Sequence, residues 1–148
     1  MAKGFILAAP SSGSGKTSLT FGLLAALRMA GTAVQGFKVG PDYIDPHYHA
    51  LAAGRPCPNL DPWAMTPERM KSLLTASDAD LCVIEGVMGL FDGAQSGGGS
   101  TADLARTLGL PVVLVVDAKG MSGSVAALVH GFSRFDPSID VAGVILNR

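Results

Sequence analysis

The chain has 148 residues, of which 48% are hydrophobic and 16% charged, and its formal net charge is −1. This length suits one domain with a substantial core, and the composition excludes a disordered or coiled-coil protein. The scattered basic residues argue against nucleic acid as a partner, and the lack of about 18 uninterrupted apolar residues argues against a membrane span. We therefore expect a cytoplasmic protein with neither nucleic acid nor membrane as a partner.

Short apolar runs alternate with segments of helical periodicity along the chain. The apolar runs lack a clean polar alternation, which is typical of parallel strands buried on both faces, and they cover residues 5–9, 34–39, 81–87, 112–117 and 141–146. Helical patterns cover residues 17–30, 67–75, 101–108 and 123–132. This βαβ alternation predicts an α/β fold with a doubly wound, mainly parallel sheet, helices on both faces, and ligands at the carboxyl ends of the strands.

Two segments interrupt this alternation. Residues 40–63 are expected to form a long and mostly irregular segment, and segments of this kind are usually functional or disordered. The glycine-rich stretch 95–100 is expected to be a mobile loop over the sheet edge.

The strongest motif is the loop Pro10-Ser11-Ser12-Gly13-Ser14-Gly15-Lys16-Thr17, between the first predicted strand and the first predicted helix. Small residues let successive N–H groups point at phosphate oxygens, and the start of the helix adds its positive end. We expect Lys16 to bridge the β- and γ-phosphates and the Thr17 hydroxyl to ligate magnesium. The motif predicts a P-loop NTPase-type fold that binds ATP and Mg²⁺, the nucleotide being contacted by Ser12, Gly13, Ser14, Gly15, Lys16, Thr17 and Ser18. The alternative is a flexible turn with a helix cap at Thr17.

Three carboxylates are candidates for the metal and the acceptor substrate. Glu85 ends a predicted buried strand, and that position faces magnesium in a P-loop fold. Asp42 and Asp45 lie three residues apart in a loop stiffened by glycine and proline, so both can point at one ion. We assign Asp42 to the metal, with Thr17 and Glu85, and Asp45 to the acceptor side. The structural alternatives are a solvated carboxylate at a strand end for Glu85 and turn residues for the two aspartates.

Several weaker candidates lie outside these motifs. His47 and His49 resemble a metal pair, but a spacing of two places them on different helix faces and disfavours zinc. Lys38, His47 and Arg55 are an alternative source of positive charge for an acidic substrate. Asn147, at the end of the last predicted strand, is a candidate hydrogen-bond partner of the adenine base.

The tryptophan and the cysteines carry little functional signal. Trp63 is expected to pack in the core or in a lid rather than to act as a stacking platform. Cys82 lies in an apolar run and is expected to be a buried small hydrophobe. Cys57 lies between two prolines with no basic neighbour to activate its thiol.

Taken together, these motifs resemble the amino-terminal domain of the cobyrinic acid a,c-diamide synthases, relatives of dethiobiotin synthetase and cobyric acid synthase. The resemblance covers essentially the whole chain and rests on residues 9–17, 37–46, 59–63, 85–93 and 116–118, of which the second and fourth blocks are highly specific. Pro10, which replaces the first glycine of the general phosphate-loop motif, is normal for this family.

The resemblance implies a ligase of cobalamin biosynthesis. It amidates the a- and c-side-chain carboxylates of a corrinoid, cobyrinic acid, through an acyl phosphate formed with ATP and Mg²⁺. Lys16 is then catalytic, Asp45 is a candidate proton acceptor, and Asp92 is a second candidate by family analogy, although positioning roles suit both aspartates equally.

The resemblance also implies a glutaminase domain that supplies ammonia from glutamine. Its nucleophilic cysteine has no match in this chain, and neither Cys57 nor Cys82 takes that role. We therefore expect residues 1–148 to be one P-loop ATP-binding synthetase domain, the front part of a longer protein, with the glutaminase domain as its partner.

Alternative functions remain open at this point. A partitioning or cell-division ATPase of the ParA/MinD type has a signature lysine directly after the first loop residue, where this chain has Ser11. A dethiobiotin synthetase would use carbon dioxide, and its glycine-rich loop has a different sequence. A diamide synthase for hydrogenobyrinate or nickel-sirohydrochlorin shares the phosphate chemistry, and the sequence does not distinguish it. The oligomeric state, for which a homodimer is one candidate, is not fixed by the sequence either.

Overall fold

The computed structural model describes residues 3–148, and its centre is a six-stranded sheet with the order β3-β2-β4-β1-β5-β6. Every neighbouring pair of strands is parallel. The strands are β1 (Gly4–Ala8), β2 (Val34–Val39), β3 (Asn59–Leu60), β4 (Leu81–Glu85), β5 (Val112–Asp117) and β6 (Val141–Asn147). The predicted α/β class is confirmed, and the sheet is wholly rather than mainly parallel.

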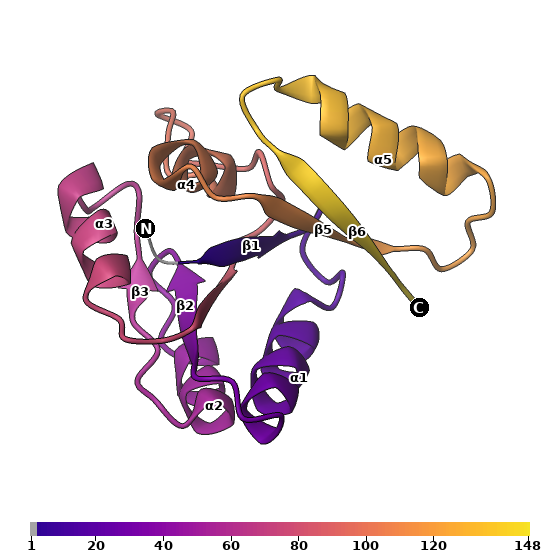
Figure 1. Ribbon diagram of the computed structural model, residues 1–148. Helices are drawn as coiled ribbons and strands as arrows, with labels where there is room; N and C mark the ends of the chain where they lie inside the picture. The colour runs from indigo at the N-terminus through magenta and orange to yellow at the C-terminus, as the bar shows by residue number, and fades with distance from the viewer. Residues whose placement is uncertain (1–2) are drawn as a thin grey trace.

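Helices cover both faces of this sheet. They are α1 (Lys16–Met29), α2 (Asp45–Ala53), α3 (Pro67–Thr75), α4 (Thr101–Leu108) and α5 (Ser124–Phe135). Helices α1 and α2 lie on one face, and α3, α4 and α5 lie on the other (Figure 1). The chain winds outwards from β1 in both directions, which confirms the predicted doubly wound arrangement.

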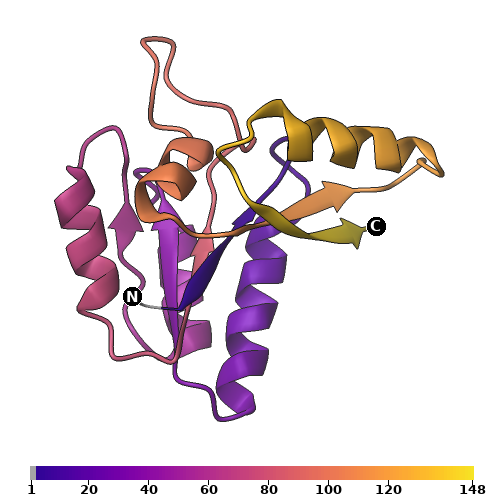
Figure 2. The ribbon, with the colours of Figure 1, turned by 45° about the horizontal axis from the view of Figure 1, so that its top comes forward.

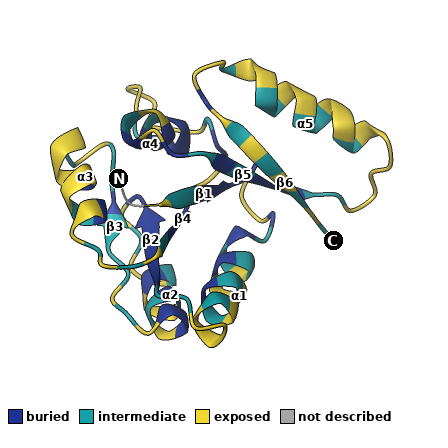
Figure 3. Cartoon of the chain, in the orientation of Figure 1, coloured by how far each residue is buried: buried dark blue, intermediate teal, exposed yellow. Residues whose placement is uncertain are grey.

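The core consists of two apolar layers separated by the sheet. Alternate residues of the central strands point to opposite faces, so Leu7 packs towards α1 and Ile6 towards α4. The central strands are almost entirely buried, whereas α5 is partly to fully exposed along its whole length (Figure 3). Parallel strands covered on both faces explain the continuous apolar runs in the sequence.

The helix ends follow from local chemistry. In α4, Ser100 and Asp103 form a reciprocal capping box, and the helix ends at Gly109 with a φ of 64°. The Thr66 side chain accepts a hydrogen bond from the backbone N–H of Arg69 at the start of α3. Helix α1 differs, because no side chain in the described part of the chain caps its first turn.

The expectation of a mostly irregular segment over residues 40–63 did not include the regular elements that the segment holds. This segment contains α2 and the short strand β3, which pairs with β2 in parallel. Helix α2 is hard to recognise because its sequence, DPHYHALAA, has a weak apolar stripe whose buried positions include His49. Pro46 in its first turn and Gly54 at its end, with a φ of 71°, are the local signals that do mark it.

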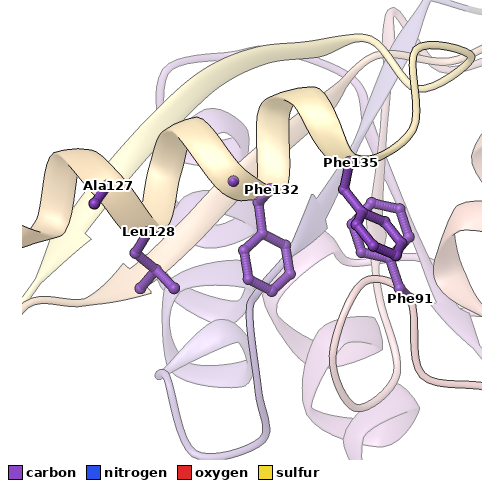
Figure 4. Close-up of a pocket in the computed structure, with 6 residues that line it drawn as sticks. Phe91, Ala127, Leu128, Phe132 and Phe135 are labelled. Atoms are coloured by element: carbon purple, nitrogen blue, oxygen red, sulfur yellow. The ribbon is translucent and has the colours of Figure 1, made fainter.

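Two surface features lie on the α4–α5 side. The loop between β4 and α4 stands out from the body of the molecule (Figure 2). An apolar cavity of about 420 Å³ lies along α5, where Leu128, Phe132 and Phe135 point the same way and Phe91 lies against Phe135 (Figure 4). None of the helices in residues 3–148 is long and apolar enough to cross a membrane.

Candidate functional site

The phosphate loop connects β1 to α1 and leaves the start of α1 open. Gly13 and Gly15 have φ values of 80° and 93°, a region that L residues rarely adopt. A Cβ atom on Gly15 would lie 2.4 Å from Asn147 Nδ2, so a side chain at this position would displace the end of that asparagine. The Ser14 hydroxyl donates to the Ser11 carbonyl at 3.0 Å and fixes the curl of the loop. Since no side chain caps α1, its first N–H groups remain available to an anion.

Lys16 extends from this loop towards the segment after β4. It is buried, and its Nζ donates to the carbonyl oxygen of Met88 at 2.7 Å. Burial has the largest influence and lowers the pKa of Lys16, although the nearby Glu85 carboxylate opposes it. Met88 itself has a φ of 45°, which is unusual for a residue with a side chain. An anionic phosphate is a stronger partner for this ammonium than a neutral carbonyl.

Glu85 lies at the centre of the site and is almost fully buried. Its Oε1 accepts a hydrogen bond from the Thr17 hydroxyl at 2.6 Å and lies 3.1 Å from Lys38 Nζ. Its Oε2 lies 2.5 Å from His49 Nε2. Burial alone would raise the pKa of Glu85, but the His49 hydrogen bond, the Lys38 charge and the Thr17 hydrogen bond together hold it below its ordinary value. Glu85 is therefore ionised at neutral pH and available to a cation.

The two aspartates after β2 take different positions. Asp45 Oδ2 lies 3.3 Å from Thr17 Oγ1 and 3.1 Å from Lys38 Nζ. Asp42 Oδ1 accepts hydrogen bonds from the backbone N–H groups of Ile44 and Asp45, and its Oδ2 lies 3.7 Å from Lys38 Nζ. Asp45 is thus the aspartate beside Thr17, while Asp42 also holds the turn into α2. The metal role assigned to Asp42 stays a prediction.

Lys38 places its ammonium among these carboxylates. It is buried, and the attraction of Glu85 and Asp45 raises the pKa of Lys38 in spite of burial. The oxygen atoms of Asp45 and Glu85 beside it, and the Thr17 hydroxyl that contacts both carboxylates, are of the kind that Mg²⁺ prefers. No group of three or more His, Cys, Asp or Glu side chains among residues 3–148 forms a cation site by itself. Magnesium commonly uses one or two carboxylates together with substrate phosphates, so these residues fit Mg²⁺ delivered with a nucleotide.

His49 belongs to the site as a partner of Glu85, a role that the sequence did not suggest when it paired His49 with His47 as a disfavoured zinc site. Its side chain is fully buried, its Nε2 contacts Glu85, and its Nδ1 has no hydrogen-bond partner in the described residues. In the tautomer that donates from Nε2, the lone Nδ1 is only an unsatisfied acceptor. The available signal was the spacing from Asp45, because residues four apart lie on one face of a helix.

The remaining predicted residues surround the same loop. Asp92 is exposed, its Oδ2 accepts the Gly89 N–H at 2.9 Å, and its charge acts on Lys16. Asn147 Nδ2 donates to the Ser14 carbonyl at 3.0 Å, from the end of β6. Ser12 and Ser18 are exposed, in the loop and on α1. The structure thus brings the predicted residues to one edge of the sheet, and their individual roles stay predictions.

Other expectations need correction. The proposed basic trio does not form, because Arg55 pairs with Asp78 at the amino end of β4 and His47 is exposed with its Nδ1 2.9 Å from the Tyr43 carbonyl oxygen. Trp63 does not lie in the core, since 69% of its surface is exposed. The expectation for Cys57 needs no correction, because burial raises the pKa of its thiol to about 12, which opposes formation of a reactive thiolate.

Comparison with known proteins gives three findings. The family model described as the CobQ/CobB/MinD/ParA nucleotide binding domain matches residues 5–148. The chain is 60% identical over 149 residues to a hydrogenobyrinate a,c-diamide synthase of Brucella anthropi, and 60% identical over 151 residues to one of Mycobacterium bovis. These matches cover 99% and 96% of this chain but 34% and 33% of the relatives, so the chain spans about a third of their length.

A solved structure, that of chloroplast FtsY from Physcomitrella patens, has a similar fold. Its TM-score is 0.66 at 16% sequence identity, and the match covers all of this chain and 50% of that one. At this identity the likeness supports the fold alone.

Proposed function

Because the chain belongs to the CobQ/CobB/MinD/ParA nucleotide binding domain family, we propose that it binds ATP with Mg²⁺ and activates a corrinoid carboxylate for amide formation. One observation carries this proposal. Lys16 and the open start of α1 face the same space as Thr17, Glu85 and Asp45, so a phosphate chain and its cation have partners of opposite charge. About 60% identity to named diamide synthases supplies the substrate class.

The names of the relatives favour one of the two corrinoids considered. They are named for hydrogenobyrinate, one of the alternatives to cobyrinic acid, and we take hydrogenobyrinate as the acceptor. The amidated groups are its a- and c-side-chain carboxylates. Since the relatives are about three times as long as this chain, we assign the supply of ammonia from glutamine to a glutaminase domain in the remaining length.

The side chains divide the chemistry between them. A carboxylate is already ionised at neutral pH, so its attack on the γ-phosphate needs alignment and charge stabilisation rather than a general base. Lys16 and the first N–H groups of α1 stabilise the transferred phosphoryl group, and Lys38 adds a second ammonium beside it. Thr17 and Glu85, with Asp42 or Asp45, would hold Mg²⁺, which would neutralise phosphate charge.

The second half of the reaction needs a proton acceptor. Ammonia attacks the acyl carbon, phosphate leaves, and the nitrogen gives up a proton. Asp45, within the carboxylate cluster, is the first candidate acceptor, and Asp92, whose charge acts on Lys16, is the second. Either aspartate also fits a role in positioning.

A switch ATPase is the competing function, because MinD and ParA share the family model. Such a protein uses water as the nucleophile and needs no corrinoid. The residue after the first position of the loop is Ser11 rather than the signature lysine of that group, which favours the ligase.

The test is to supply hydrogenobyrinate, ATP, Mg²⁺ and an ammonium salt and to measure ADP and amide together. Amide formation should equal corrinoid-dependent ADP formation, and Lys16→Ala should abolish both by losing about 2–4 kcal/mol of transition-state stabilisation. The melting temperature of Lys16→Ala should stay close to that of the unmodified chain, because this lysine acts mainly on ligand. Near-normal turnover in this variant would refute the assignment of residues 10–17 as a phosphate loop. A rate of ADP formation that does not change when the corrinoid is added would favour the switch ATPase.

A further inference from the structure

A second cavity lies beside the phosphate site, at the carboxyl ends of β2, β3 and β4. Its volume is about 250 Å³, and its walls are mostly apolar, with Pro41, Trp63, Val87 and Met88 as the larger side chains. The Trp63 and Met88 side chains are 69% and 45% exposed. Large apolar side chains held at the surface around a concavity are typical of a binding site.

Glycines and a local turn fix the shape of this cavity. A Cβ atom on Gly99 would lie 3.2 Å from the Cβ of Trp63. The glycine therefore lets Trp63 pack closely against the loop between β4 and α4. The Asp61 carboxylate accepts the backbone N–H groups of Trp63 and Ala64, at 2.9 and 3.3 Å, and holds the turn that carries the indole. The one acidic residue in the lining therefore serves the backbone, and the space it borders suits an apolar ligand.

The cavity and the phosphate site share residues. Met88 lines the cavity with its side chain, while its carbonyl accepts the hydrogen bond from Lys16 Nζ. Pro41 lines it immediately before Asp42, whose carboxylate lies near Lys38. A ligand that contacts Met88 and Pro41 is thus separated from the ammonium group of Lys16 by Met88, and from that of Lys38 by Pro41 and Asp42.

The strand order indicates which end of a nucleotide faces this cavity. The phosphate loop follows β1, with β4, β2 and β3 on one side and β5 and β6 on the other. Thr17 and Glu85, the proposed magnesium ligands, lie on the β4 side, whereas Asn147 lies at the end of β6. The γ-phosphate therefore points towards the β4 side and the base towards the β6 side, which leaves the cavity to the acceptor rather than to adenine.

We propose that this cavity holds an apolar edge of the tetrapyrrole ring, with Trp63 against the ring face, and directs one of its carboxylates towards Lys16. The assignment rests on the proposed function. A tetrapyrrole has a flat, largely apolar ring with carboxylates on flexible arms at its rim, and a rigid indole suits a flat conjugated face. A complete small-molecule pocket occupies roughly 300–1,000 Å³, so the cavity admits an edge of the ring.

The test uses Trp63 as a reporter, since it is the only tryptophan in the chain. Titration with hydrogenobyrinate should quench its fluorescence and saturate, and equilibrium dialysis should give the same dissociation constant. Trp63→Ala, measured by dialysis, and Met88→Ala, measured by both methods, should each weaken corrinoid binding by about tenfold. Phe135→Ala is the matched control, because Phe135 is an exposed aromatic residue in the other apolar cavity, and it should leave binding unchanged.

Three results would refute the assignment of the cavity, and only one of them would also refute the proposed function. Corrinoid that binds Trp63→Ala with unchanged affinity would refute this cavity and leave the proposed reaction intact. Quenching without saturation, with dialysis showing binding, would likewise place the ring elsewhere. A chain that binds no hydrogenobyrinate by either method would refute the cavity and the proposed function together.

Discussion

Replacing His49 with alanine tests whether this histidine stabilises the buried Glu85 carboxylate. The imidazole is fully buried and lies 2.5 Å from Glu85, so its removal leaves a void and takes one partner from a buried carboxylate. Breaking a buried pair costs roughly 3–5 kcal/mol. Glu85 keeps Thr17 and Lys38 as partners, which places the expected loss at the low end, about 3 kcal/mol. For a chain of this length the melting temperature should fall by about 6–12 °C.

The assay is chemical and thermal unfolding of His49→Ala beside two comparison variants. His49→Gln keeps a hydrogen-bond donor and should recover part of the loss. His47→Ala removes an exposed histidine from the same helix and should change stability by less than about 0.5 kcal/mol. Equal stability of His49→Ala and His47→Ala would refute the view that His49 supports Glu85.

Two further predictions concern the same carboxylates. Glu85→Gln should raise the Mg²⁺ concentration needed for half-maximal turnover by about tenfold, and Asp42→Asn should raise it less, because the backbone already occupies one Asp42 oxygen. A Mg²⁺ titration measures this, with Asp78→Asn as an exposed control, and an unchanged midpoint in both site variants would give these residues purely structural roles. The second prediction concerns unfolding in acid. The pKa values of Asp42 and Glu85 are lowered in the folded chain. The two ionised carboxylates therefore stabilise the fold above the ordinary carboxyl pKa, and this stabilisation is lost as the pH falls through their pKa values in the folded chain. The unfolding free energy should therefore decrease below about pH 4.5, less steeply in Glu85→Gln, and a slope unaffected by that substitution would contradict the prediction.

Local sequence signals predicted the parts of the site that depend on neighbouring residues. The phosphate loop needs small residues before Lys16 and Thr17, and Glu85 ends an apolar strand, so both could be recognised from short segments. The βαβ alternation was equally local and gave the doubly wound sheet.

What the sequence did not predict depends on contacts between distant segments. Helix α2 buries His49 against Glu85 from β4, and a polar residue on the buried face weakens the apolar pattern by which helices are recognised. The central place of Lys38 requires β2 and β4 to be neighbours, although they are far apart in the chain. The exposure of Trp63 likewise depends on the turn held by Asp61 and on the loop at Gly99.

The central claim, that ATP phosphorylates a corrinoid carboxylate, is tested most directly by the fate of oxygen atoms. With ¹⁸O in the side-chain carboxylates of hydrogenobyrinate, attack on the γ-phosphate transfers one labelled oxygen, which leaves as phosphate when ammonia displaces it. Labelled inorganic phosphate should appear in proportion to the amide formed, with dilution only from competing hydrolysis. Amide formation accompanied by phosphate free of substrate-derived oxygen would contradict the acyl-phosphate mechanism.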